Sequence, residues 1–182
     1  MAVYIIIAII ILLIVYIFVL YNSFISLDNK VKEAFSTMDV YLKKRWDLIP
    51  NLVETVKGYA SHEQETFSEV TKIRNNNYES MSNEEKIITN EEVNTKIDRI
   101  MALKETYPEL KANENFKNLS TELKKIEDDI ANSRKYYNAV VRVYNNKVEM
   151  FPNSLIAKIF GYHSKKMFEA KNEERKNVKV EL

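Results

Sequence analysis

The chain opens with an unbroken apolar run, residues 2–21, that contains no charge, no glycine and no proline. About twenty such residues are what an α-helix needs to cross the hydrocarbon core of a bilayer. Inside that helix every backbone N–H and C=O group finds a partner within the segment, so the run can lie in lipid without an orphaned polar group. We therefore expect a transmembrane anchor over residues 1–22.

A cleaved secretory signal is the alternative for such a start. It would need a basic beginning, a shorter apolar core and a cleavage site of small residues. The first basic residue is Lys30, the apolar run is too long, and the following segment LYNSFISLDNK has no A-x-A pattern. A lipoprotein signal is excluded because the chain has no cysteine. The segment is expected to stay on the protein.

Composition indicates a single helical domain beyond the anchor. The remaining part, about 160 residues, is enough for one domain with a modest core. Two glycines and three prolines in 182 residues leave few tight turns for a sheet, so long helices are favoured. Twenty-seven basic against 26 acidic residues give no reason to expect a nucleic-acid partner. The absence of cysteine excludes disulfides and cysteine-ligated metals.

Apolar residues at alternating steps of three and four predict four amphipathic helices after the anchor. The first continues out of the membrane to Pro50. A proline lacks the backbone donor and clashes with the preceding turn, so it should kink this helix or start a second one. The second helix should end at the asparagines of residues 75–77, which suit a helix exit and a turn.

The third and fourth helices have capping signals. Ser82 and Glu85 have the spacing of a capping box, and the break follows at Tyr107 and Pro108. Asn113 can cap the fourth helix. The expected core positions of the fourth helix are Phe116, Leu119, Leu123, Ile126, Ile130, Tyr137, Val140 and Tyr144.

Four amphipathic helices with short connections are buried most economically in an up-and-down bundle. We predict an all-α fold in which the transmembrane helix precedes an antiparallel four-helix bundle over residues 23–150. An intermolecular coiled coil is the structural alternative, because heptads do not reveal whether the partner helix lies in the same chain. An amphipathic segment, 151–170, and a charged tail, 171–182, complete the chain.

Three blocks of the sequence resemble those of a known family. They are DVYLKKRWDLIPNLVETVKGYASHEQ at 39–64, YPELKANENFKNL at 107–119 and RKYYNAVVRVYNNKVEMFPNSLIAKIFGY at 134–162. In this order they resemble the LemA family of bacterial membrane proteins; residues 75–97 and the tail are least similar. The resemblance implies a single-pass bacterial membrane protein with an antiparallel helical bundle. It implies no catalytic residue and no cofactor, because the family has no established activity.

The residue types needed for catalysis are sparse. His62 and His163 are far apart, and the sequence after His62 lacks the second histidine of a helical zinc motif. Two glycines cannot form a glycine-rich phosphate loop. An enzyme would require Glu54, Glu63 and Asp129 to converge as metal-binding carboxylates, and the Glu-x-x-His pairs typical of such bundles are absent. We expect no catalytic activity, no metal and no cofactor.

The segment Lys43, Lys44, Arg45, Trp46 is the most unusual local feature, because Arg45 occupies an apolar position of the heptad beside the chain's single tryptophan. A buried arginine requires an acidic partner, which Glu54 or an acid from the last helix, such as Asp128 or Asp129, could supply. The structural interpretation is an ion pair that fixes helix register. The functional interpretation is that these four residues bind a partner protein.

An up-and-down bundle returns the chain to the bilayer after residue 148. The segment 151–168 that arrives there interleaves apolar and basic residues, a pattern suited to anionic headgroups. Alternatively, its apolar residues cap the bundle. The residues expected at the membrane interface are Phe151, Leu155, Ile156, Lys158, Ile159, Phe160 and Tyr162.

No basic residue precedes the anchor and several follow it from Lys30 onward, which favours a cytoplasmic bundle at the cell membrane. The leading functional hypothesis is an interaction or scaffold module whose partners are the bilayer and an unidentified membrane or envelope protein. The alternative is a membrane-organising or remodelling protein that holds the bilayer at two places and self-associates.

Overall fold

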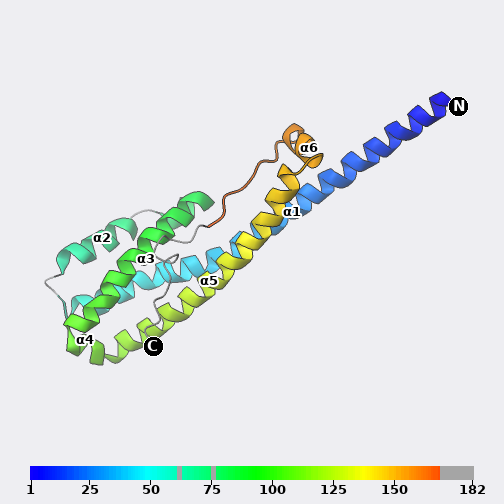
Figure 1. Ribbon diagram of the computed structural model, residues 1–182. Helices are drawn as coiled ribbons and strands as arrows, with labels where there is room; N and C mark the ends of the chain where they lie inside the picture. Colours follow the sequence, from blue (N-terminus) through cyan, green and yellow to red (C-terminus); the bar gives the residue numbers. More distant parts are fainter. Residues whose placement is uncertain (61–62, 75–76, 169–182) are drawn as a thin grey trace, which may run out of the picture. The chain divides into compact units, whose positions relative to one another are not determined.

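A computed structural model describes residues 1–60, 63–74 and 77–168 of the chain. The predicted charged tail therefore lies outside the described residues. Every regular element among the described residues is helical, so the predicted all-α class is confirmed. Figure 1 shows the long helices that make up most of the molecule.

The helix α1 (Ala2–Lys57) is continuous from the apolar run through Pro50. Of the two alternatives expected at Pro50, a kink or the start of a new helix, the second is therefore wrong. A proline removes one backbone hydrogen bond, whereas the side chains around it gain burial: Ile49, Leu52 and Val56 are each 2% exposed or less. The chain leaves the helix instead at Gly58, a residue that disfavours helix interiors.

Within the described ranges, five further helices and one 3-10 turn follow. Asn77 caps the turn, and the capping box predicted at Ser82 and Glu85 is present. Asn113 accepts a hydrogen bond from the backbone N–H of Phe116 (2.9 Å), as expected of a helix cap. The elements are α2 (Gln64–Arg74), η1 (Tyr78–Ser80), α3 (Asn83–Thr106), α4 (Pro108–Ala112), α5 (Glu114–Glu149) and α6 (Asn153–Ile159).

The described chain forms two compact units, and α1 and α5 each contribute to both. The second unit, Phe35–Arg134, is a helical bundle. Asp39 of α1 binds Lys86 of α3, and Arg45 further along α1 binds Asn90 further along α3, so these two helices run in the same direction. Glu127 of α5 binds Arg45 from the returning helix.

The second unit is held together by the predicted apolar stripes. The helix α2 packs on α3, where Glu69 accepts hydrogen bonds from Lys96 and Arg99. The short helix α4 was not predicted from the sequence. Its residue Leu110 is fully buried. The other buried side chains include Met38, Leu42, Leu52 and Val56 of α1, Phe67 and Val70 of α2, Val93, Ile97 and Ile100 of α3, and Phe116, Leu123, Ile126 and Ile130 of α5.

The first unit joins Met1–Ala34 with residues 135–168. The C-terminal part of α5 lies beside α1, with α6 close to both (Figure 1). Val141 is fully buried whereas the predicted Val140 is half-buried, since a helix of 3.6 residues per turn drifts from a strict heptad. The most apolar stretch of α1 is only 6% buried, unlike a helix of a soluble core. This is the one helix among the described residues that is long and apolar enough to cross a membrane.

After α6 the chain runs back along α5 without regular structure, and two asparagines of α5 hold it. Asn145 accepts from the backbone N–H of Lys165 and donates to its C=O, both at 2.8 Å. Asn138 makes the same pair of bonds to Phe168 at 2.9 and 2.8 Å. Each amide side chain thus replaces the backbone partner that a neighbouring strand would supply.

Asp28 of α1 fastens the same returning segment. Its two carboxylate oxygens bind Lys165 and Lys32, each at 2.7 Å, and its side chain is 17% exposed. Partial burial by itself would raise the pKa of Asp28, but hydrogen bonds and charges from Lys165 and Lys32 outweigh it and lower that pKa. The ionised carboxylate therefore stabilises the docked segment.

We expect Asp28→Asn to loosen the segment that contains Lys165. The neutral side chain loses both ion pairs, so the backbone amide of Lys165 should exchange its hydrogen about ten-fold faster. Hydrogen exchange of the full-length protein measures this rate. Asp47→Asn removes an exposed ion pair of the second unit and serves as the control; equal exchange in the two variants would contradict the role given to Asp28.

The ion pairs of Asp28 also make the stability of this docked segment depend on pH. Because the folded pKa of Asp28 is lowered, its stabilisation is complete above the ordinary pKa of an aspartate and is lost as the pH falls through the lowered value.

Candidate functional site

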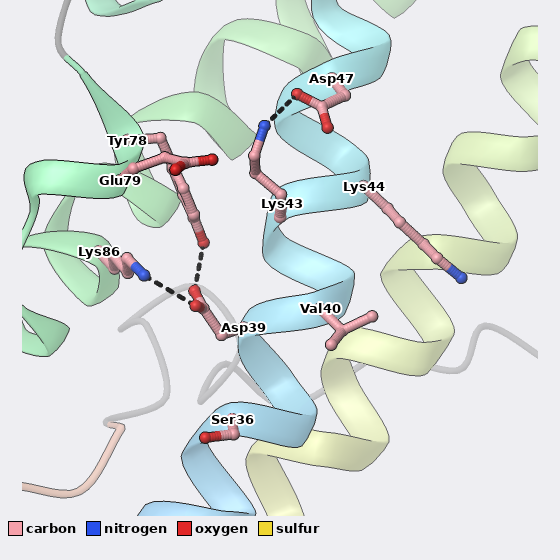
Figure 2. A pocket seen from close by; sticks show the side chains of 9 residues that line it. All are labelled: Ser36, Asp39, Val40, Lys43, Lys44, Asp47, Tyr78, Glu79 and Lys86. Carbon is pink, nitrogen blue, oxygen red and sulfur yellow. Dashed lines mark hydrogen bonds and ion pairs between the residues drawn. The ribbon is translucent and has the colours of Figure 1, made fainter.

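A groove of about 550 Å³ runs over the surface of the second unit between α1 and the start of α3. Figure 2 shows its lining side chains, among them Lys43 and Lys44 of the predicted partner-binding cluster. Basic and acidic residues alternate around it. The remaining lining residues are Ser36, Asp39, Val40, Asp47, Tyr78, Glu79 and Lys86.

Tyr78 is the aromatic residue that lines this groove, and it is largely buried. Its hydroxyl donates to Asp39 at 2.6 Å, and Lys86 binds the other oxygen of that carboxylate at 2.7 Å (Figure 2). Burial, and then the hydrogen bond to Asp39, raise the pKa of Tyr78 far above its ordinary range, so the phenol stays protonated. The ammonium group of Lys86 lies 4.8 Å from the ring centroid of Tyr78, within cation–π distance.

The four residues of the predicted partner-binding cluster differ in their exposure to solvent. Lys43 and Lys44 line the groove, whereas Arg45 and Trp46 are 1% and 6% exposed. Trp46 packs on the ring of Tyr78, with centroids 5.3 Å apart. Two of the four residues are thus available to a partner, and the other two support the surface from below.

The residues predicted at the membrane interface also differ in their exposure to solvent. Phe151, Leu155 and Ile159 recur every fourth residue and are 79%, 57% and 79% exposed. Phe160 and Lys158 are exposed as well, whereas Ile156 and Tyr162 are half-buried. Some apolar side chains of the segment therefore pack inward and others face outward, and contact of the outward face with a membrane stays a prediction.

The inward face of this segment packs on α1. Tyr16 donates a hydrogen bond to the Asn153 side chain at 3.3 Å. The rings of Tyr21 and Phe160 have centroids 4.9 Å apart, and those of Phe24 and Tyr162 are 5.1 Å apart. Tyr16 and Tyr21 belong to the apolar run. The segment that contains α6 thus lies alongside the last turns of that run.

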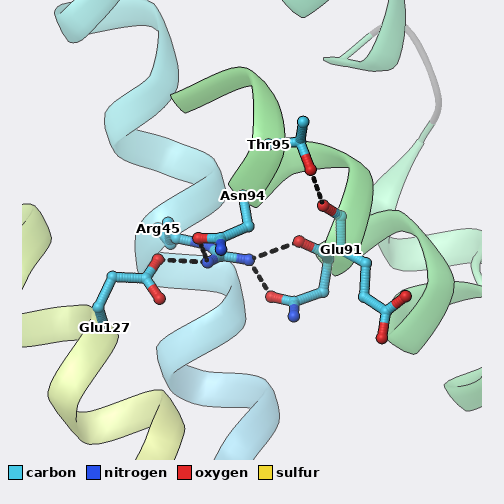
Figure 3. Close-up of polar contacts among 6 residues, drawn as sticks. Arg45, Glu91, Asn94, Thr95 and Glu127 are labelled. Carbon is cyan, nitrogen blue, oxygen red and sulfur yellow. Dashed lines mark hydrogen bonds and ion pairs between the residues drawn. The ribbon is translucent and has the colours of Figure 1, made fainter. Parts of the chain in front are cut away.

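Arg45 lies at the centre of a polar cluster in the second unit (Figure 3). Its guanidinium donates to the Glu127 carboxylate, to the Asn94 side chain at 3.1 Å, and to both the side chain and the backbone C=O of Asn90, the latter at 2.9 Å. Burial lowers the pKa of Arg45 and the charge of Glu127 opposes this effect. An arginine keeps its proton under such a shift, so the pair stays ionic.

The acidic partner of Arg45 comes from the last bundle helix, which is one of the two sources expected from the sequence, but it is not one of the residues named there. Glu127 pairs with Arg45, not Glu54, Asp128 or Asp129, because the face of α5 that meets α1 carries Glu127 next to the buried stripe. Asn90 and Asn94, which also accept hydrogen bonds from Arg45, were not predicted from the sequence. Their signal was a pair of polar residues four apart within the apolar period of the third helix.

We expect Glu127→Ala to destabilise the second unit by about 2 kcal/mol, because it leaves the buried Arg45 charge without its counter-ion. The figure lies below that of a fully buried pair because the Glu127 side chain is 36% exposed. Trp46, the single tryptophan, reports unfolding of this unit by fluorescence as urea is added.

Glu122→Ala is the matched control, since Glu122 is an exposed acid on the same helix and should change stability by less than about 0.5 kcal/mol. Glu127→Gln keeps an acceptor for Arg45 and should cost less than Glu127→Ala. Equal unfolding curves for Glu127→Ala and Glu122→Ala would contradict a stabilising role for the ion pair.

Comparison with known proteins identifies relatives of this chain. A model of the LemA family matches residues 34–182. Protein LemA of Metamycoplasma hominis is 28% identical over 162 residues, which cover 86% of this chain and 72% of that protein. Magnetosome protein MamQ 2 of Paramagnetospirillum magneticum is 24% identical over 177 residues, and Magnetosome protein MamQ of Magnetospirillum gryphiswaldense is 25% identical over 177 residues.

Each magnetosome match covers 83% of this chain and 65% of the relative, so this chain spans slightly less than two thirds of the MamQ proteins. The family model covers most of the chain, including the three blocks on which the resemblance was based. The chain belongs to the LemA family.

Proposed function

We propose that this protein is a non-enzymatic interaction module of the cell membrane, attached to one bilayer at two places. The first attachment is the apolar run of α1, which crosses the membrane once. The second is the outward face of the segment 151–160, which lies in the interface. The bundle then offers helical surfaces to a partner protein, and its mechanism is binding alone.

The observation that supports this proposal best is the position of the exposed apolar side chains. Phe151, Leu155 and Ile159 are exposed although apolar, and their segment packs beside Tyr16 and Tyr21 at the end of the apolar run. A soluble surface gains nothing from such a row, whereas a membrane interface buries it.

The depth of this contact agrees with an interfacial segment. Tyr16 lies five residues before Tyr21, so at about 1.5 Å per residue the Asn153 contact is about 7 Å inside the end of the run. Amphipathic segments bury their apolar face about 5–10 Å into the boundary between headgroups and acyl chains. Lys158 is exposed on the same segment and suits anionic headgroups.

The bundle is proposed to lie in the cytoplasm. Basic residues follow the run from Lys30 onward and none precedes it, which matches the positive-inside rule. The groove beside Lys43 and Lys44 is the proposed partner surface, because it is open and presents both charges and the Tyr78 ring. A membrane-organising role would use the same two attachments together with self-association.

Nitroxide labels test the second attachment. The chain has no cysteine, so single substitutions Phe151→Cys, Leu155→Cys and Ile159→Cys can each carry a label in the full-length protein in vesicles. We expect all three labels to be relaxed by oxygen, which partitions into lipid, more than by a water-soluble nickel chelate. Tyr136→Cys is the control, an exposed aromatic position 15 residues earlier in the same unit, and it should show the reverse. Four labels that all prefer the nickel chelate would contradict the interfacial attachment.

The control variant also reports the side of the membrane. A membrane-impermeant maleimide should label Tyr136→Cys only after the cells are opened, and labelling in intact cells would place the part of the chain that follows the apolar run outside.

Photo-crosslinking tests the partner surface. A photoreactive residue at Val40, which lines the groove and is 53% exposed, should form a protein adduct in cells that Lys44→Glu abolishes. The same residue at Thr121, exposed on α5, is the control. An adduct that survives Lys44→Glu, or that forms equally at Thr121, would argue against the groove as the binding surface.

A further inference from the structure

A second groove, of about 480 Å³, lies in the first unit between α1 and α5. Its lining includes Ser23, two residues after the apolar run, and Met150 and Asn153, close to where the interfacial segment begins. In Figure 1 these parts of α1 and α5 lie side by side close to α6. Neither the interfacial row of apolar side chains nor the proposed partner surface uses this groove.

The charges of the groove are of one sign. Lys30 comes from α1 and Lys147 from α5, and the lining contains no acidic side chain. Within the part of the chain that the structure describes, neither lysine has an ion pair, whereas Lys32 and Lys165 in the same unit share Asp28. Two ammonium groups on one groove without a counter-ion favour an anionic ligand.

The other lining groups suit a phosphate ester with an apolar part. Ser23, Ser26 and Asn146 supply hydrogen-bond donors beside the lysines. Val143 and Met150 line the same groove and are 54% and 62% exposed. A free inorganic anion would leave these apolar side chains uncovered, but a lipid would cover them with its glycerol and the first carbons of its acyl chains.

The groove lies at the depth of lipid headgroups if the apolar run spans the bilayer. Ser23 is about 3 Å beyond the end of the run, and the backbone of Lys30 is about 13 Å beyond it, at 1.5 Å per residue. Side chains on a helix lean toward its N-terminus, so the ammonium group of Lys30 reaches back toward the membrane. The headgroup layer extends about 5–8 Å beyond the hydrocarbon core on each side.

We propose that this groove binds one anionic phospholipid, with the phosphate between Lys30 and Lys147 and the acyl chains passing over Met150. This inference rests on the proposed attachment to the bilayer and adds to it a specific lipid. Basic pockets between helices at a membrane surface bind anionic headgroups by the same chemistry.

Native mass spectrometry of the full-length protein, purified in mild detergent, tests the site. The wild-type protein mixed with equal amounts of phosphatidylglycerol and phosphatidylcholine should retain the anionic lipid preferentially. The double variant Lys30→Gln, Lys147→Gln should retain about ten-fold less phosphatidylglycerol. The control is Lys32→Gln, which removes the same charge two residues away from a lysine already paired with Asp28, and it should retain the wild-type amount.

Three results would overturn the site. These are unchanged retention in the double variant, an equal loss in Lys32→Gln, and release of the lipid by inorganic phosphate, which would indicate a phosphate site without a lipid. The nitroxide labels keep the two proposals apart, because labels buried at residues 151–159 together with unchanged lipid retention would reject the headgroup site alone. Circular dichroism verifies that the variants, which change exposed or half-buried side chains, remain folded.

Discussion

The helix α1 is the element on which the rest of this structure depends. Its first twenty residues are apolar and can satisfy their backbone hydrogen bonds only within a helix if they lie in lipid. The same hydrogen-bonding pattern continues without a break to Lys57, through a proline. Residues of each compact unit pack against a different stretch of this helix. The element that carries the apolar run therefore also supplies core positions of the bundle.

Polar contacts fix the helix register, which the apolar stripes alone do not determine. Leucine and isoleucine stripes tolerate sliding by a turn, but the guanidinium of Arg45 finds its acceptors on α3 and α5 in one register only. Asn138 and Asn145 do the same for the segment after α6, since each pairs with both backbone groups of one residue. Buried polar groups thus specify the packing that burial of apolar surface stabilises. The Nδ2 group of Asn90, buried without a partner among the described residues, is a cost of this arrangement.

The first unit combines two features that suit a membrane surface. Phe151, Leu155 and Ile159 form an exposed apolar row, and Lys30 with Lys147 forms a basic groove next to it. In our proposal the first feature interacts with any lipid through the hydrophobic effect, whereas the second discriminates by charge.

Local signals in the sequence determined the elements of this fold. The apolar run predicted the long N-terminal helix, the capping residues Ser82 and Asn113 predicted two helix starts, and the stripes predicted the core of α5. These signals succeed because hydrogen bonding and periodicity act over a few residues. The sequence also placed Arg45 on the buried stripe, which the structure confirms.

Only the tertiary structure decided which residues meet. Pro50 stays inside α1 because burial of Leu52 and Val56 outweighs a local preference for a break. Arg45 pairs with Glu127 and not with Asp128 or Asp129, since the rotation of α5 about its own axis fixes which acid faces α1. The amphipathic segment is likewise divided into a packed and an exposed face by the rings of Tyr21 and Phe24. A sequence encodes such contacts only through the packing of helices that are distant along the chain, and no local rule contains that information.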